Sequence, residues 1–315
     1  MSRLIAMFAA LALSTITLSS ACIAAPASGL SFTLEPSTKG DHIRATFRKI
    51  DRETNNWSTS FAPAELAGLD VARFRAAGTH PISFAIVREA GRVDCAGTGG
   101  NSLARGSCQM TPDAAFIRLL EQRGIPRPTE EQAYGLISLN VRRELVDALA
   151  AARYPAPRVN DLMSLTALGV TRTYISELAR AGYRPQSLDT LLQFKALNIT
   201  PDYIRGFVRL GYSNLPASEL IQLKALNITA DFVAGFERIG YGRLPASQLV
   251  QLQALGVTPD YVAGFQRAGY RNLPVSKLIE LKALGVTPQF VRAMQADDGS
   301  MPFSEEVGRR RPRSR

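Results

Sequence analysis

The chain has 315 residues, of which 46% are hydrophobic and 20% are charged, and its formal net charge is +10. This composition excludes an intrinsically disordered chain and a membrane-embedded one, and the length suffices for one large or two ordinary domains. Half of the excess charge lies in the last eight residues, which hold five arginines: Arg309, Arg310, Arg311, Arg313 and Arg315.

Residues 1–27 have the three parts of a secretory signal peptide. Arg3 precedes an apolar run from Leu4 to Leu13, and small residues follow. We expect cleavage near Ala24 or Ala27. No later segment approaches the length of apolar chain that a membrane-spanning helix needs. The mature protein is therefore expected to be periplasmic or secreted, without a transmembrane segment.

Cys22 raises a second possibility for the N-terminus. The string Leu18–Cys22 resembles a bacterial lipoprotein cleavage site, but Ser19 stands where an aliphatic residue is usual. We favour ordinary cleavage, which discards Cys22, over a lipid anchor at this residue.

Residues 28–110 predict a small, β-rich domain with an antiparallel sheet of four to six strands. Alternating or continuous apolar residues indicate the strands, and Glu89–Arg92 indicates a tight turn between two of them. Pro63–Leu69 is expected to form a helical turn between strands. The expected strands are Ser31–Glu35, His42–Arg48, Ile82–Val87 and one that includes Val93–Cys95.

Cys95 and Cys108 remain in the mature chain after ordinary cleavage. An even number of cysteines in an oxidising compartment favours one disulfide between them, across a hairpin whose loop is the glycine-rich segment 96–107. Two isolated buried thiols are the alternative. A redox-active pair is disfavoured, because the close C-x-x-C spacing is absent.

The rest of the chain is built from a repeat of 29 residues. The string Ala-Leu-Gly/Asn-Val/Ile-Thr recurs without insertion, and a Gly-Tyr pair recurs with the same period, so two separate motifs define the spacing. The strings begin at Ala167, Ala196, Ala225, Ala254 and Ala283, and the pairs at Gly182, Gly211, Gly240 and Gly269.

Each repeat predicts two short helices. Thr200–Asp202 starts the first one, with a threonine cap, a proline in the first turn and an aspartate at the positive end of the dipole. Gly211 ends this helix, and Ser213–Pro216 forms the turn to the second. The second helix ends at a position that holds only Gly or Asn, which most readily adopt the left-handed conformation. Helices of about ten residues are marginal alone, so the repeats must stack.

Weaker copies precede the clear ones. Leu139–Val141 and Arg153–Tyr154 lie one period upstream of matching residues, and Thr111–Ile125 indicates a remnant of a first helix. We therefore predict an α+β protein in which the small sheet domain is followed by an α-solenoid-like array over residues 111–296. The best copies span residues 167–295, and residues 297–315 form a disordered, arginine-rich tail.

The repeats resemble those of a known family. The string Leu-Gly-Val-Thr-Pro-x-Tyr/Phe-Val, followed by Gly-Tyr and Leu-Ile-x-Leu, is similar to GVTP-type helical repeats of bacterial extracytoplasmic proteins, which often lie behind penicillin-sensing membrane metallopeptidases. The resemblance covers residues 167–295 and loosely includes the sheet region. It implies an extracytoplasmic sensing or interaction module. It does not imply peptidase activity, because the H-E-x-x-H zinc motif is missing.

The chemistry of an enzyme is not evident in the sequence. The histidines are His42 and His80 alone, no His/Cys/Asp/Glu cluster has metal-ligand spacing, and no nucleophile elbow or phosphate loop occurs. The carboxylates fall mainly at helix starts, where capping explains them. We expect no enzymatic activity, no cofactor and no metal.

Two columns of residues recur in the repeats without an obvious packing role. An arginine stands near the end of each first helix, where it either interacts with the helix dipole or forms a basic ladder for an acidic peptide or polyanion. A glycine stands in the middle of the same helix, which indicates close helix approach or a ligand lying over bare backbone. The columns are Arg180, Arg209, Arg238 and Arg267, and Gly206, Gly235 and Gly264.

These features support an exported, non-enzymatic protein-interaction or sensor module whose repeat surface binds an envelope protein or peptide. The alternative is an exported binder of nucleic acid or another anionic polymer through the arginine column and the tail. A purely structural role in the envelope, without a discrete ligand, is the third possibility. The tail itself either binds an anionic polymer or serves only solubility.

Overall fold

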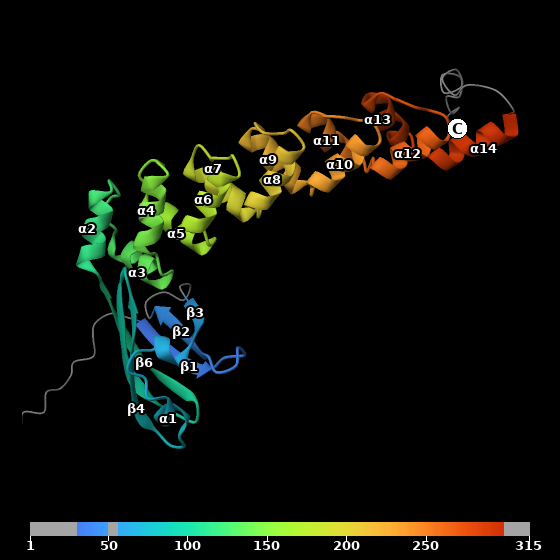
Figure 1. Ribbon diagram of the computed structural model, residues 1–315. Helices are drawn as coiled ribbons and strands as arrows, with labels where there is room; N and C mark the ends of the chain where they lie inside the picture. The colour runs from blue at the N-terminus through green and yellow to red at the C-terminus, as the bar shows by residue number, and fades with distance from the viewer. Residues whose placement is uncertain (1–29, 50–55, 299–315) are drawn as a thin grey trace, which may run out of the picture. The chain divides into compact units, whose positions relative to one another are not determined.

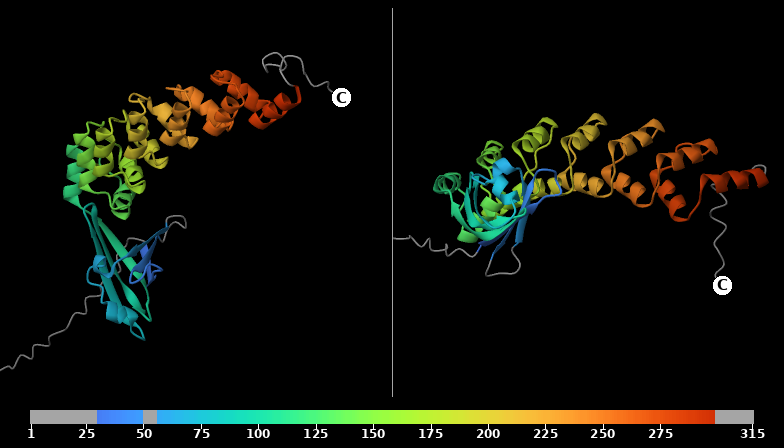
Figure 2. Two further views of the ribbon diagram at one scale, coloured as in Figure 1. Left: turned by 45° about the vertical axis from the view of Figure 1, so that its right-hand side comes forward. Right: turned by 90° about the horizontal axis from the view of Figure 1, so that it is seen from below.

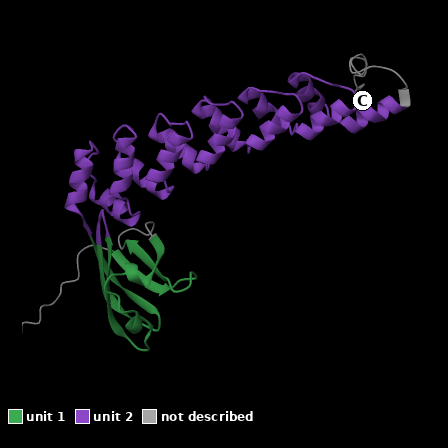
Figure 3. Ribbon diagram, in the orientation of Figure 1, with its two compact units in different colours: residues 1–87, 93–110 green, residues 88–92, 111–315 purple. Residues whose placement is uncertain are grey.

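The computed structural model describes residues 30–49 and 56–298. The chain divides into two compact units, which Figure 3 distinguishes by colour. Unit 1 covers residues up to 87 together with 93–110, and unit 2 covers residues 88–92 and those from 111 onward. The predicted signal peptide, Cys22 and the five tail arginines lie outside the described residues.

Unit 1 contains a six-stranded antiparallel sheet with the strand order β3-β2-β1-β6-β5-β4. The expected helical turn is present as a short 3-10 helix, η1, and is followed by a one-turn helix, α1. The elements are β1 Leu30–Pro36, β2 Ile43–Lys49, β3 Asn56–Phe61, η1 Pro63–Glu65, α1 Val71–Arg75, β4 His80–Arg88, β5 Gly91–Gly100 and β6 Leu103–Pro112.

Alternation along the strands gives the sheet one apolar face. Phe32 lies opposite Phe47 and Leu34 opposite Ala45 in the pairing of β1 with β2, and all four are buried. Because side chains on a strand alternate between faces, the polar residues between them lie on the other side. The alternation of apolar and polar residues that predicted these strands is therefore confirmed, and its apolar residues form one buried face of the sheet.

Cys95 on β5 and Cys108 on β6 form the predicted disulfide and are buried. The hairpin around them differs from the expectation, because β5 and β6 continue to Gly100 and from Leu103, which leaves a two-residue turn. Gly97 and Gly106 thus lie within the strands. A Cβ on Gly97 would clash with the carbonyl of Arg105, so these glycines allow close backbone approach rather than loop flexibility.

Unit 2 is an array of short helices in two rows. Each helix contacts the helix two places along the chain, so even-numbered helices stack on one another and odd-numbered helices form the second row. The rows are visible in Figure 1, with α7, α9, α11 and α13 on one side and α8, α10 and α12 on the other, and Figure 2 gives two further views. The helices are α2 Ala114–Gln122, α3 Glu130–Ser138, α4 Arg143–Ala151, α5 Val159–Ala167, α6 Arg172–Arg180, α7 Leu188–Ala196, α8 Pro201–Arg209, α9 Ala217–Ala225, α10 Ala230–Arg238, α11 Ala246–Ala254, α12 Pro259–Arg267, α13 Val275–Ala283 and α14 Pro288–Asp298.

The predicted helix starts and stops are confirmed. The hydroxyl of Thr200 accepts a hydrogen bond from the backbone N–H of Tyr203 at 3.1 Å, and the equivalent threonines cap α6, α10, α12 and α14. Asn198, Asn227 and the glycines that follow the helices have positive φ. The last helix, α14, extends to Asp298, past the expected end of the array at residue 296.

Residues 88–92, at the turn between β4 and β5, belong to unit 2 because they complete two of its helices. The Arg88 guanidinium donates to the carbonyls of Ile137 and Ser138, at 2.6 and 2.7 Å, at the end of α3. The Glu89 carboxylate accepts from the backbone N–H of Arg143 at 2.7 Å, at the start of α4. Each charge complements the dipole of the helix end that it contacts.

We expect Arg88→Met to lower the free energy of unfolding by about 1.5–3 kcal/mol, because two carbonyls lose a charged donor. Urea unfolding followed by circular dichroism measures the change. Arg105→Met, an exposed position on β6, is the control and is expected to change stability by less than about 0.5 kcal/mol. Equal effects of the two substitutions would show that the capping by Arg88 contributes nothing.

Candidate binding surface

The arginine column lies at the ends of helices in one row. Arg180, Arg209, Arg238 and Arg267 are the last residues of α6, α8, α10 and α12, and all four are exposed. In the described part of the chain, none of the four forms an ion pair with a carboxylate. Arg238 donates through Nε to the carbonyl of Ala234 at 3.3 Å, which is the expected interaction with the helix end. That bond uses one of the five guanidinium N–H donors.

Three further arginines lie in the loops that follow these helices. The loops span residues 181–187, 210–216, 239–245 and 268–274 and lead to the odd-numbered helices. Arg184, Arg243 and Arg271 are exposed there, and they too lack an ion pair with any carboxylate that the structure describes. They do not form a regular column in the sequence: Arg184 and Arg271 share one repeat position, but the two repeats between them have Ser213 and Gly242 there, and Arg243 lies one residue further along. We call the seven residues the arginine edge: Arg180, Arg184, Arg209, Arg238, Arg243, Arg267 and Arg271.

Hydrogen bonds join the last three of these loops, 210–216, 239–245 and 268–274. The Tyr212 hydroxyl donates to the carbonyl of Leu244 in the next loop at 2.8 Å, and Tyr241 donates likewise to Leu273 at 2.7 Å. Burial raises the pKa of both hydroxyls. At Tyr212 the carboxylate of Glu237 adds to this rise, whereas Arg243 opposes it. Both tyrosines therefore stay protonated donors at neutral pH.

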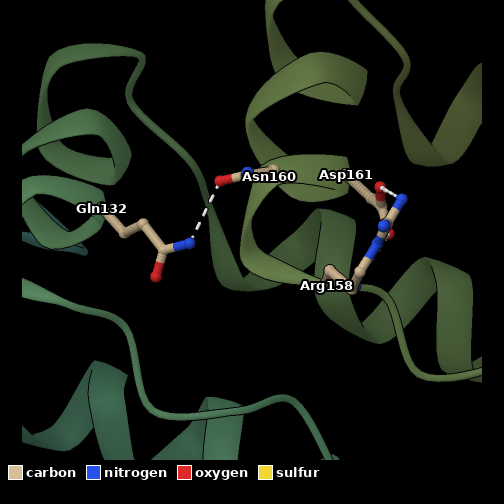
Figure 4. A network of polar contacts seen from close by, with 4 residues as sticks. All are labelled: Gln132, Arg158, Asn160 and Asp161. Carbon is tan, nitrogen blue, oxygen red and sulfur yellow. Dashed lines mark hydrogen bonds and ion pairs between the residues drawn. The ribbon is translucent and has the colours of Figure 1, made fainter.

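Some arginines away from the edge have acidic partners, whereas Arg118, Arg142, Arg153 and Arg292 are exposed and form no ion pair with a carboxylate that the structure describes. Between residues 172 and 287, the two arginines away from the edge are Arg172, paired with Glu144 at 3.2 Å, and Arg205, paired with Asp202. In an earlier repeat Arg158 pairs with Asp161 at 3.0 Å, as Figure 4 shows. That pairing raises the pKa of Arg158 and lowers the pKa of Asp161. Between residues 172 and 287, the lack of ion pairs thus distinguishes the arginines of the edge from the two that lie away from it.

Three lysines of the array lie at the opposite ends of the helices, whereas Lys277 in the first turn of α13 pairs with Glu280 at 3.1 Å. Lys195, Lys224 and Lys282 lie over tyrosine rings, with 4.6, 4.8 and 4.8 Å between Nζ and the ring centroid. Four carboxylates lie near the arginine edge, at Glu177, Asp189, Glu219 and Glu237. Seven arginines against four carboxylates leave the edge basic.

The glycine column is not on this surface, because the next helix of the row covers it. A Cβ on Gly235 would lie 2.6 Å from Cγ of Pro259, the first residue of α12, and Gly264 faces Pro288 in the same way. The interpretation that the column allows close helix approach is therefore confirmed. The alternative of a ligand over the glycines is wrong for all three buried residues, Gly206, Gly235 and Gly264.

No known family model and no curated protein matches the chain. The similarity to GVTP-type repeats therefore stays a prediction. Among the residues described, no group of three or more His, Cys, Asp and Glu side chains is placed to hold a metal ion. None of the helices in the described ranges has both the length and the hydropathy that a membrane crossing requires.

We expect Gly235→Ala to destabilise the array, although alanine is intrinsically the better helix former by about 1 kcal/mol. The new Cβ would overlap Pro259, and overpacking costs about 1–3 kcal/mol. Thermal and urea unfolding of the purified protein measure the sign of the change.

The double variant Gly235→Ala/Pro259→Ala is the matched control. It removes the Cγ at 2.6 Å and leaves the Cβ of residue 259 at 3.2 Å, so it should recover part of the lost stability. A stabilising effect of Gly235→Ala alone would contradict the close approach of α10 and α12.

Proposed function

We propose that this protein is an exported, non-enzymatic interaction module that binds an acidic segment of an envelope protein along the arginine edge. The observation that supports the proposal is the absence of ion pairs at the edge, whereas Arg172 and Arg205 are both paired. Arginine presents a planar fork of donors that matches a carboxylate with two hydrogen bonds. Exposed arginines held at fixed places can therefore select carboxylates by geometry as well as by charge.

Two features favour a protein segment over nucleic acid. Asp189, Glu219 and Glu237 interrupt the basic surface, and they would repel a ligand that carries closely spaced phosphates. Nucleic acid without sequence preference is usually bound with aromatic side chains on which bases stack. Tyr212 and Tyr241 are partly buried, and their hydroxyls bond to the next loop, so they support the edge rather than offer such a platform.

The envelope location of the proposed partner rests on the N-terminal sequence. A charged residue, an apolar run and small residues in 1–27 favour export. The disulfide between Cys95 and Cys108 agrees with folding in an oxidising compartment.

Affinity capture from envelope extract with the tagged protein tests the proposal. We expect wild type to retain a protein that Arg238→Gln/Arg267→Gln loses, with binding reduced about tenfold or more because two charged contacts are removed. Arg172→Gln/Arg205→Gln is the matched control. It removes the same number of charges from paired positions and should retain the protein.

Retention by both double variants, or loss from both, would show that the edge is not the binding surface. Recovery of nucleic acid or another anionic polymer in place of a protein, with affinity that falls steeply as salt rises, would favour the polyanion alternative.

A further inference from the structure

The spacing of the arginine edge bears on the shape of the segment that it binds. We infer that the ligand is an extended polyproline-II segment that carries a carboxylate at every third residue. This inference rests on the proposed function, because it specifies the conformation of the acidic segment and the period of its charges. It concerns the four arginines that recur at the repeat period, Arg180, Arg209, Arg238 and Arg267.

The guanidinium groups of Arg238 and Arg267 take the same place in two successive repeats, whereas no atom of Arg209 lies within 4 Å of a Cβ on Gly206, and Glu177 stands at the equivalent position before Arg180. Nη2 of Arg238 lies 3.8 Å from the position of a Cβ on Gly235, and Nη2 of Arg267 lies 3.9 Å from that of Gly264. Arginine and glycine are three residues apart and share one helix face. The missing glycine side chain leaves room for the guanidinium beside the helix. In these two repeats the position of the charge therefore follows the repeat, and the attachment points of all four arginines recur at the 29-residue period.

The distance between successive charges is then the distance between stacked helices. α8, α10 and α12 contact each other directly, and small groups lie between them at the glycines. Packed helices are about 8–10 Å apart. Hydrogen bonds from Tyr212 and Tyr241 hold the adjoining loops at the same period. A ligand that contacts several arginines at once therefore needs an anionic group about every 8–10 Å along one face.

Polyproline II meets this requirement with the fewest residues. It has three residues per turn and rises about 3.1 Å per residue, so residues i, i+3 and i+6 lie on one face about 9.3 Å apart. Same-face residues of a β-strand are about 6.6 Å apart at i+2 and about 13 Å at i+4, which misses the period. An α-helix repeats its face at i+7, about 10.5 Å, and the mismatch grows over four arginines.

Energetic considerations agree with this geometry. Polyproline II has no internal hydrogen bonds to break and is already extended, so little conformational entropy is lost on binding. Spaced carboxylates also avoid Asp189, Glu219 and Glu237, which a continuous acidic run would meet. Regular spacing lets the four contacts act together, because each bound carboxylate raises the effective concentration of the next.

Synthetic peptides of equal charge test the inference on the full-length protein. The first is (Glu-Pro-Pro)4, and two others have the same length: the second places its four glutamates at every second residue, and the third groups them in one block before the prolines. A fourth, longer α-helical peptide carries its four glutamates at every seventh residue. We expect (Glu-Pro-Pro)4 to bind about tenfold or more tightly than each of the others, measured by fluorescence anisotropy at low salt.

Variants of the protein test whether the arginine edge is responsible for the tighter binding of (Glu-Pro-Pro)4. Arg238→Gln/Arg267→Gln should abolish the difference between the peptides, and Arg172→Gln/Arg205→Gln should leave it unchanged. Equal affinity for all acidic peptides, or tightest binding of the block or helical peptide, would overturn the period-three ligand while the proposed function stands. Absence of binding to every acidic peptide overturns the inference too. In that case the proposed function would stand if wild type still captured an envelope protein that Arg238→Gln/Arg267→Gln loses. If neither protein captured one, both the proposed function and the inference would fail.

Discussion

The helices of the array are too short to be stable alone, and each depends on the equivalent helix of the next repeat. Nine-residue helices lose more in chain entropy than their own hydrogen bonds return. Phe207, Phe236 and Phe265 recur at the repeat period and are almost completely buried in the shared core. Tyr203 also donates to the carbonyl of Ile228, one repeat later, at 2.9 Å. Packing therefore imposes one spacing on every residue of the repeat, including those on its surface.

Because packing sets the spacing of the repeats, a charged residue on the surface of each repeat recurs at the same spacing. The middle of each even-numbered helix is used for packing, since Gly235 and Gly264 face the prolines that begin the following helices. The last residue of the helix is exposed, and there the chain has arginine four times. Lys195, Lys224 and Lys282 lie at the other ends of the helices and cover tyrosine rings. Arginine thus takes the exposed last position of the even-numbered helices, and these three lysines take the positions beside the rings.

Local rules predicted much of the fold from the sequence. Threonine caps, left-handed Gly and Asn residues and the 29-residue period depend on neighbours along the chain, and the structure has them where the pattern places them. Contacts between distant segments were not predictable in the same way. Nothing near Arg88 and Glu89 in the sequence indicates that they cap α3 and α4. The glycines between Cys95 and Cys108 suggested a loop, because close approach of two strands is a tertiary property. Arg184, Arg243 and Arg271 form no continuous column in the sequence, because the repeats between Arg184 and Arg271 have Ser213 and Gly242 at that position, although the loops place all three beside the ends of the even-numbered helices.

Amide hydrogen exchange with and without the captured acidic partner tests most directly whether the arginine edge is the binding surface. The loops at 181–187, 210–216, 239–245 and 268–274 should become protected, because these segments adjoin the unpaired arginines. The segments that join odd-numbered to even-numbered helices, at the opposite ends, should exchange as before. Protection of those segments or of the β-sheet, with the four loops unchanged, would contradict binding at the arginine edge.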